Sequence, residues 1–372
     1  MSVESSSPVA PVTFEDDVAR RVPAIQDLFS QLIEHYCGTG DAPVSAICER
    51  IGLHRKLAWQ LRSAAYAPDP FQAVRFMPTR AGLDTVIGAM QKLGSADGWT
   101  LRLRQAADAL DALVEAHAGD RTNLEMLVDA WAPQPDQTKW REKAFLGNCF
   151  IWGAQTKAQL SISVLRESKT RPGWIDIAQI RGLVGLRRMR PNVHWLVNQS
   201  IVIDDRADVS VELRREPLDE AAAEAMGGVP ILPAFCSSPL PRLRRRPVEN
   251  GLINDELLPA PVGSQGQQHI VTGEVIRNLA PAHATHQNKR AHFGAVSRTP
   301  SELFLLDHFV HRDLFPGVER ELCVFGELNS PVTQDDDDLL PVSEQIESLG
   351  TGLGSARTPD VPRYPELLRW IF

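Results

Sequence analysis

The sequence predicts an α+β multidomain protein in which an all-helical N-terminal domain precedes a larger mixed α+β C-terminal domain. Its 372 residues exceed the usual size of one domain. Apolar residues recur at helical spacing in the first part of the chain, whereas β-branched and alternating runs appear after about residue 136. Two prolines in the segment 132–135 mark a boundary. We therefore expect domains at residues 14–135 and 136–372.

The N-terminal domain is expected to begin after a short polar tail. Residues 1–13 are rich in Ser and Pro and lack the apolar run of a signal peptide, so they are typical of a disordered segment. Thr13 is a good N-cap, and Asp16 and Asp17 would stabilise the first turn of the helix that follows. This helix has one apolar side and is expected to end before Gly38.

The segment 41–65 has the spacing of two helices joined by a tight turn, a helix-turn-helix. Ile47 and Ile51 lie one helical turn apart. Gly52 then ends the helix, since glycine adopts a positive φ without a Cβ clash. A second helix opens with His54. Three apolar side chains are expected to close the two helices on each other: Leu53, Ala58 and Leu61. A plain corner between two helices, without a DNA-binding role, is the structural alternative.

Further helices are expected at residues 82–93 and 99–118, and a short one is expected to end at Trp131. Thr122 and Glu125 have the spacing of a capping box that would start this short helix. Helices beyond the helix-turn-helix suggest a surface for dimerisation.

The helix-turn-helix segment resembles the bacterial helix-turn-helix transcriptional regulators. The resemblance rests on the key positions of that pattern: Cys48, Gly52, Leu53, Ala58 and Leu61. Cys48 stands in place of the usual alanine, and His54 in place of the usual Ser or Thr cap. The resemblance implies that the second helix enters the major groove of double-stranded DNA, and that a homodimer binds two half-sites about one helical turn apart.

The residues expected to contact DNA lie on the second helix: His54, Arg55, Lys56, Trp59, Gln60 and Arg62. Arg55 and Lys56 would meet bases or phosphates, Gln60 could read adenine, and Arg62 would hold a phosphate. Residues 42–80 contain six basic residues and two acidic ones, a local excess of four positive charges in a chain of net charge −8. This contrast predicts a localised DNA contact surface.

In the C-terminal domain, mixed elements are expected without a regular βαβ alternation. One helix is expected at residues 138–152, and a short one at 218–226. Alternation makes 209–213 the clearest strand, and residues 175–186 fit either a strand or a helix. The other strands are expected at 158–165, 193–203, 269–275, 291–297 and 322–328.

Residues 300–314 are expected to form a helix with His308 and His311 on one face. Together with Asp307 these histidines support an alternative function, a metal-dependent hydrolase. The sequence has no HExxH motif, nucleophile elbow or P-loop lysine, and we therefore expect no enzyme, no cofactor and no bound metal.

Basic clusters at Arg187, Arg188 and Arg190 and in the segment 239–247 are expected in surface loops, where they either contact phosphates or meet solvent and acidic partners. The acidic run 335–338 and the glycines of 350–354 are also expected in loops.

The five cysteines are scattered, with no CxxC spacing, which favours a reducing compartment. No apolar run approaches the length of a membrane span, so we expect a cytoplasmic protein. The C-terminal domain, with more than 200 residues, is expected to sense a small-molecule effector or to support assembly. A protein-interaction scaffold is the remaining alternative.

Overall fold

The computed structural model divides the chain into two compact units, Met1–Asp136 and Gln137–Phe372. It describes residues 12–40, 42–94, 97–131, 137–200, 214–248, 253–284, 293–326, 338–340, 342, 344, 346–352, 361 and 363–371. We call the two parts the helical unit and the sheet unit. Among the described residues, no helix combines the length and the apolar character that crossing a membrane requires.

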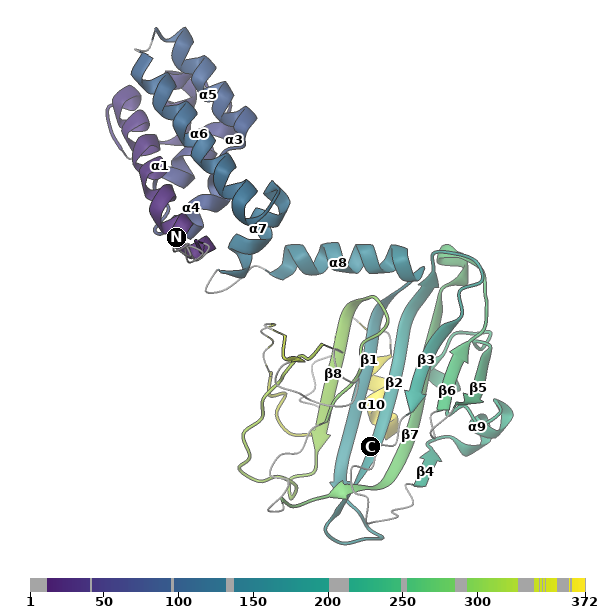
Figure 1. Ribbon diagram of the computed structural model, residues 1–372. Helices are drawn as coiled ribbons and strands as arrows, with labels where there is room; N and C mark the ends of the chain where they lie inside the picture. Colours follow the sequence, from purple (N-terminus) through teal and green to yellow (C-terminus); the bar gives the residue numbers. More distant parts are fainter. Residues whose placement is uncertain are drawn as a thin grey trace, which may run out of the picture. The chain divides into compact units, whose positions relative to one another are not determined.

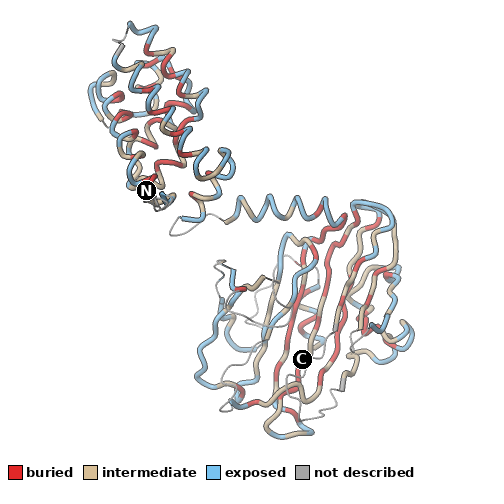
Figure 2. The backbone as a smooth tube through the Cα atoms, viewed as in Figure 1, coloured by how far each residue is buried: buried red, intermediate tan, exposed pale blue. Residues whose placement is uncertain are grey.

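The described residues of the helical unit form helices that pack around one apolar core (Figures 1 and 2). They are α1 (Phe14–Cys37), α2 (Val44–Ile51), α3 (Arg55–Ala65), α4 (Pro70–Phe76), α5 (Arg80–Lys92), α6 (Asp97–His117) and α7 (Arg121–Ala130). As expected, the Thr13 side chain caps α1 by accepting a hydrogen bond from the backbone N–H of Asp16. The helix ends at Gly38, which has a φ of 77°.

Two local expectations for the helical unit were wrong. The N-cap of α7 is Asp120, whose carboxylate accepts from the N–H of Asn123 at 2.8 Å, so the Thr122–Glu125 capping box does not start this helix. A carboxylate cap two residues earlier competes with the capping box because both would satisfy the same free N–H groups. Helix α4 lay in a proline-rich stretch and was not expected. It starts with Pro70, a residue favoured in the first turn.

The sheet unit begins with helix α8 (Gln137–Trp152), which confirms the expected helix. Its other elements are β1 (Ala154–Glu167), β2 (Trp174–Arg188), β3 (Trp195–Ser200), β4 (Arg214–Pro217), α9 (Glu220–Ala225), β5 (Leu243–Pro247), β6 (Ile253–Leu257), β7 (Gln268–Pro281), β8 (Ser301–Val310) and α10 (Tyr364–Ile371). The large sheet has the order β4-β7-β2-β1-β8 and is antiparallel except for the parallel pair of β1 and β8.

The long central strands of the large sheet are buried on both faces (Figure 2). On one face, Ile162 and Ile180 pack with Leu367 and Leu368 of α10. On the opposite face, Leu183 packs with side chains of a smaller sheet of order β3-β6-β5. Burial on both faces explains why β2 lacks a period of two, which left its sequence ambiguous between strand and helix.

Residues 301–310 form strand β8, so the expected helix at 300–314 was wrong. Their apolar residues fit a helical period. However, these residues pair in parallel with β1 along the strand, with Ile162 opposite Asp307, and so form the edge of the large sheet. Residues 293–297 and 322–326 are irregular apart from a single bridge at Phe325, so the strands expected there are not formed in the described residues. The strand expected at 209–213 lies outside the described residues.

Most residues of the two basic clusters lie on β2 and β5, and most of their charges have partners. Arg245 of β5 makes a paired contact with Asp255 of β6, at 2.7 and 2.9 Å. Arg188 of β2 is 1% exposed and donates to the backbone carbonyls of Val193 and Leu258, at 2.9 and 2.5 Å. The expectation of surface loops was therefore wrong for these residues. Pairing of β5 with β6 places Asp255 beside Arg245, and the fold brings the carbonyl of Leu258, 70 residues further along the chain, to Arg188.

Candidate nucleic-acid interface

The helix-turn-helix expected at residues 41–65 is formed by α2, a three-residue turn and α3. Gly52 adopts a φ of 78° and a ψ of 32°, and its N–H donates to the carbonyl of Cys48 at 3.0 Å. Leu53 is buried beneath the turn. His54 caps α3, since its Nδ1 accepts from the N–H of Leu57 at 3.3 Å. An imidazole therefore takes the place of the shorter Ser or Thr side chain that usually caps a helix.

Apolar packing holds the two helices in one arrangement. Ala58 and Leu61, which were expected to turn inward, are buried, and so are Ile47 and Ile51 of α2. Helix α1 packs against both helices of the pair. Its Gln26 also donates from Nε2 to the carbonyls of Ala64 and Ala67, each at 3.2 Å, at the end of α3. The surface of α3 is therefore preformed, without a need for ordering on contact with a partner.

The outer face of α3 presents Arg55 and Lys56, which are both exposed in its first turn. One turn later Trp59 is 47% exposed, and its ring meets the edge of Phe76 at 5.4 Å between centroids. Gln60 is half-buried rather than fully exposed. The six residues expected to contact DNA thus lie on α3 and its N-cap. Among their larger side chains, those of Arg55, Lys56 and Trp59 are exposed to solvent.

Arg62 has a role inside the fold. It is half-buried, and its Nε donates to the backbone carbonyl of Ala42 at 3.0 Å, just before α2. The guanidinium thereby joins the end of α3 to the start of α2.

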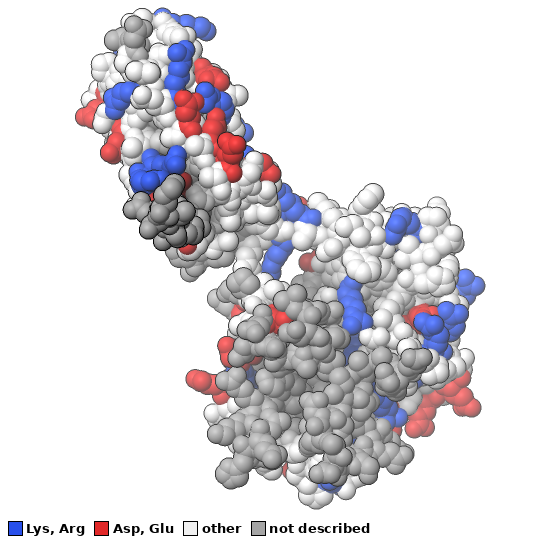
Figure 3. Space-filling model, in the orientation of Figure 1, with Lys and Arg blue, Asp and Glu red and all other residues white. Residues whose placement is uncertain are grey.

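The local charge excess seen in the sequence is partly cancelled by carboxylates from other helices. Arg75 pairs with Asp129 of α7 at 2.8 Å. Arg80 pairs with Asp108 and Asp111 of α6 at 2.5 and 3.0 Å. Accordingly, cationic and anionic side chains alternate on the visible face of the helical unit (Figure 3).

The positive charges that remain gather at the turn of the helix pair. Within the described residues, Arg50, Arg55 and Lys56 form no ion pair, and all three are exposed. Arg50 lies in the last turn of α2 and was counted in the local charge but not among the expected contacts. Arg50 lies two residues before Gly52 in the sequence, and this position could have identified it as a candidate DNA contact.

The histidines of the alternative enzyme hypothesis do not converge. Asp307 lies on the face of β8 toward α10, where it accepts a hydrogen bond from the hydroxyl of Tyr364. Its neighbour His308 faces the other way, near Phe293, and His311 follows the strand beside Asp313 at 3.5 Å. Burial raises the pKa of Asp307, although the bond from Tyr364 opposes this. No described group of three His, Cys, Asp or Glu residues is placed to hold a metal ion.

Comparison with known proteins found no family model that matches the chain, no curated protein similar to it and no similar solved structure. The function must therefore be inferred from the chemistry of the residues themselves.

Proposed function

We propose that the protein is a sequence-specific DNA-binding transcriptional regulator of the bacterial cytoplasm, with a C-terminal unit that senses an effector or supports assembly. The main support for this proposal is the arrangement of side chains in the first turn of α3. There Arg55 and Lys56 are exposed at the N-terminus of a helix whose opposite face is fully packed. The free N–H groups and the dipole of a helix N-terminus favour an anion such as a phosphate, and the two cations reinforce this preference.

The positions of the other side chains suggest their roles. Arg50 on α2 lies on the other side of the turn, where it would contact the DNA backbone while α3 enters the major groove. Gln60 is one turn further along α3 than Lys56, and its amide would read an adenine. Trp59 would place its exposed indole edge against the sugar-phosphate backbone or a thymine methyl.

One helix pair contacts only a few base pairs, which is too little for specific binding in a genome. We therefore propose that two copies of the chain bind as a homodimer, each placing its α3 in one of two half-sites about one helical turn apart. The effector, if it acts through the sheet unit, would change the affinity of this dimer for its operator.

The experiment is a titration of the purified full-length chain with random-sequence duplex DNA, read by fluorescence anisotropy across a salt series. The wild type is expected to bind with an affinity that falls steeply as salt rises. Replacing Arg55 and Lys56 with Ala is expected to lower the slope of log K against log salt by about 2, since each lost phosphate contact removes about 0.9.

A charge-matched control separates contact from net charge. Lys92 and Arg104 are exposed on α5 and α6, away from the helix pair, and the Lys92→Ala/Arg104→Ala variant carries the same charge change. This control should retain the wild-type slope. The proposal is wrong if the wild type does not bind duplex DNA at low salt, or if both double variants lose the same affinity. The helix pair would then be a structural corner.

A further inference from the structure

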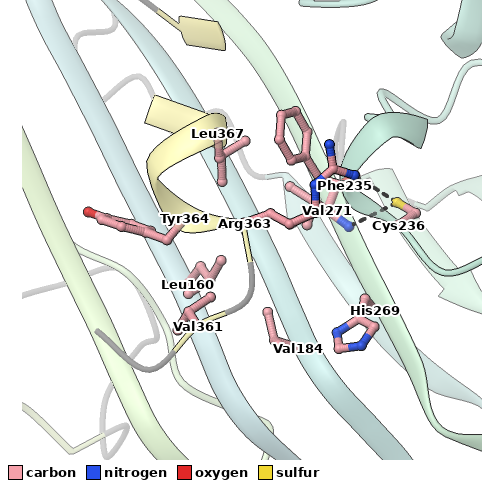
Figure 4. A pocket seen from close by; sticks show the side chains of 10 residues that line it. All are labelled: Leu160, Val184, Phe235, Cys236, His269, Val271, Val361, Arg363, Tyr364 and Leu367. Atoms are coloured by element: carbon pink, nitrogen blue, oxygen red, sulfur yellow. Dashed lines mark hydrogen bonds between the residues drawn. The ribbon is translucent and has the colours of Figure 1, made fainter. Parts of the chain in front are cut away.

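The sheet unit contains a pocket between the large sheet and the start of α10 (Figure 4). It encloses about 180 Å³. Strands β1, β2 and β7 form its floor, and the loop around Phe235 and Cys236 and the first turn of α10 form its sides. The five-stranded sheet makes this floor rigid, because the strands below the pocket are paired on both sides.

The floor and the wall under α10 are apolar. Leu160, Val184 and Val271 rise from the three strands, and Leu367 faces them from α10. A cavity with aliphatic walls of about 150 Å³ accommodates a benzene molecule. A pocket of about 180 Å³ therefore suits one six-membered ring with a small substituent.

The polar end of the pocket contains Cys236, His269 and Arg363. The thiol of Cys236 is already bonded to the backbone of Val271, and burial raises its pKa to about 11, despite opposing bonds to the backbone. It is therefore a neutral group and not a nucleophile. The Nδ1 of His269 accepts from the N–H of Gly185 at 3.3 Å.

This bond to Gly185 determines which nitrogen of His269 carries the proton. Burial lowers the pKa of His269, and nearby Lys157 lowers it further, so the ring is neutral at pH 7. A neutral ring that accepts at Nδ1 carries its proton on Nε2. Within the described residues no hydrogen bond involves Nε2 of His269, so this nitrogen can donate to a ligand.

Arg363 crosses the mouth of the pocket toward Phe235 and Cys236 (Figure 4). Its NH1 donates to the carbonyl of Ala234, and its guanidinium lies 5.1 Å from the centre of the Phe235 ring. These contacts hold the planar group in place, and within the described residues Nε and NH2 have no hydrogen-bond partner. The backbone of Arg363 has a φ of 63°, a strained conformation that often marks a binding site.

Among the described residues, the lining of the pocket contains a guanidinium and an imidazole donor but no carboxylate. The carboxylate of Asp307 on β8 accepts a hydrogen bond from Tyr364. We propose that the pocket binds a small molecule with a single ring and one carboxylate, the ring against the aliphatic floor and the carboxylate between Arg363 and His269. This would be the effector site of the proposed regulator, although ligand binding itself does not depend on the DNA-binding proposal.

The test measures the binding of three probes of one shape to the full-length chain by ligand-observed NMR and calorimetry. The probes are benzoate, neutral benzamide and cationic benzylamine. Benzoate is expected to bind saturably at one site, benzamide about tenfold more weakly, and benzylamine not measurably. The absence of saturable benzoate binding to the wild type would overturn the proposal.

Two variants locate the site. Arg363→Gln is expected to lower the affinity for benzoate about tenfold and to leave that for benzamide unchanged, because only the charged pair is lost. Its control, Arg369→Gln, removes an exposed cation from α10, outside the pocket, and should bind benzoate like the wild type.

Val184→Phe fills the floor of the pocket and is expected to abolish binding of both probes. If circular dichroism shows that this variant does not fold, Cys236→Met narrows the pocket from the loop instead. The proposal is wrong if Arg363→Gln binds benzoate as tightly as the wild type, or if a folded, filled variant still binds it. Since no DNA is present, these outcomes are independent of the DNA titration.

Discussion

Replacing Asp17 with Asn is expected to destabilise the helical unit at neutral pH and to remove a pH dependence that the wild type shows in acid. The carboxylate lies in the first turn of α1, and its side chain is 3% exposed. It accepts from the guanidinium of Arg20, from Nε of Arg21 at 2.8 Å and from Nε2 of His117 at 3.1 Å. Asp17 thus links the start of α1 to the end of α6.

The magnitude follows from the pKa of this carboxyl group. Burial works to raise the pKa of Asp17, but the hydrogen bonds from Arg21, Arg20 and His117 outweigh it and lower the pKa from 3.8 to about 2. That difference corresponds to about 2 kcal/mol of stability. Because the folded state has the lower pKa, this stability is fully present above pH 3.8 and is lost as the pH falls toward 2.

The assay is urea unfolding of the full-length chain, followed by circular dichroism at a wavelength dominated by the helices, at several values of pH. Asp17→Asn should lower the free energy of unfolding by about 2 kcal/mol at pH 7, and the difference from the wild type should shrink as the pH falls. Asp16→Asn is the matched control, since Asp16 is exposed in the same turn. Equal losses for the two variants, or a difference that persists at pH 2, would refute the reasoning.

Two further predictions concern backbone conformation and buried charge. Gly52→Ala should cost about 1 kcal/mol by urea unfolding, because its φ of 78° disfavours a Cβ although the space around it is open. Gly88→Ala, in the middle of α5 with equally open space, should stabilise the unit by about 0.5 kcal/mol, and a gain at Gly52 would contradict this account. Arg188→Met should cost about 3 kcal/mol, since it leaves buried carbonyls without their donor. The exposed Arg190→Met should cost less than 1 kcal/mol, and equal losses would show that the buried hydrogen bonds add nothing.

Local signals predicted the helical unit well because helices depend on residues close in sequence. The cap at Thr13, the stop at Gly38 and the inward side chains of α2 and α3 follow from spacing and turn chemistry. The error at α7 was also local, since Asp120 and Thr122 are both acceptable caps within two residues of each other.

Strand pairing could not be predicted in the same way. The segment 301–310 has an apolar pattern that fits a helix, and only its parallel pairing with β1, more than a hundred residues earlier, makes it a strand. This correction separates His308 from Asp307, since neighbouring residues on a strand face opposite ways. The metal-site hypothesis depended on the helix and lost its geometric basis with it.

The sequence by itself determined most helices of the helical unit, the turn at Gly52 and the placement of Arg55 and Lys56 on the outer face of α3, because each follows from the conformational preferences of neighbouring residues. Only the tertiary structure decided which charges remain available. Arg75, Arg80 and Arg188 have partners far away in the chain, whereas Arg50, Arg55 and Lys56 form no ion pair with any residue that the structure describes. The pocket beneath α10 likewise exists only because the fold brings distant strands and the C-terminal helix together, which no local pattern encodes.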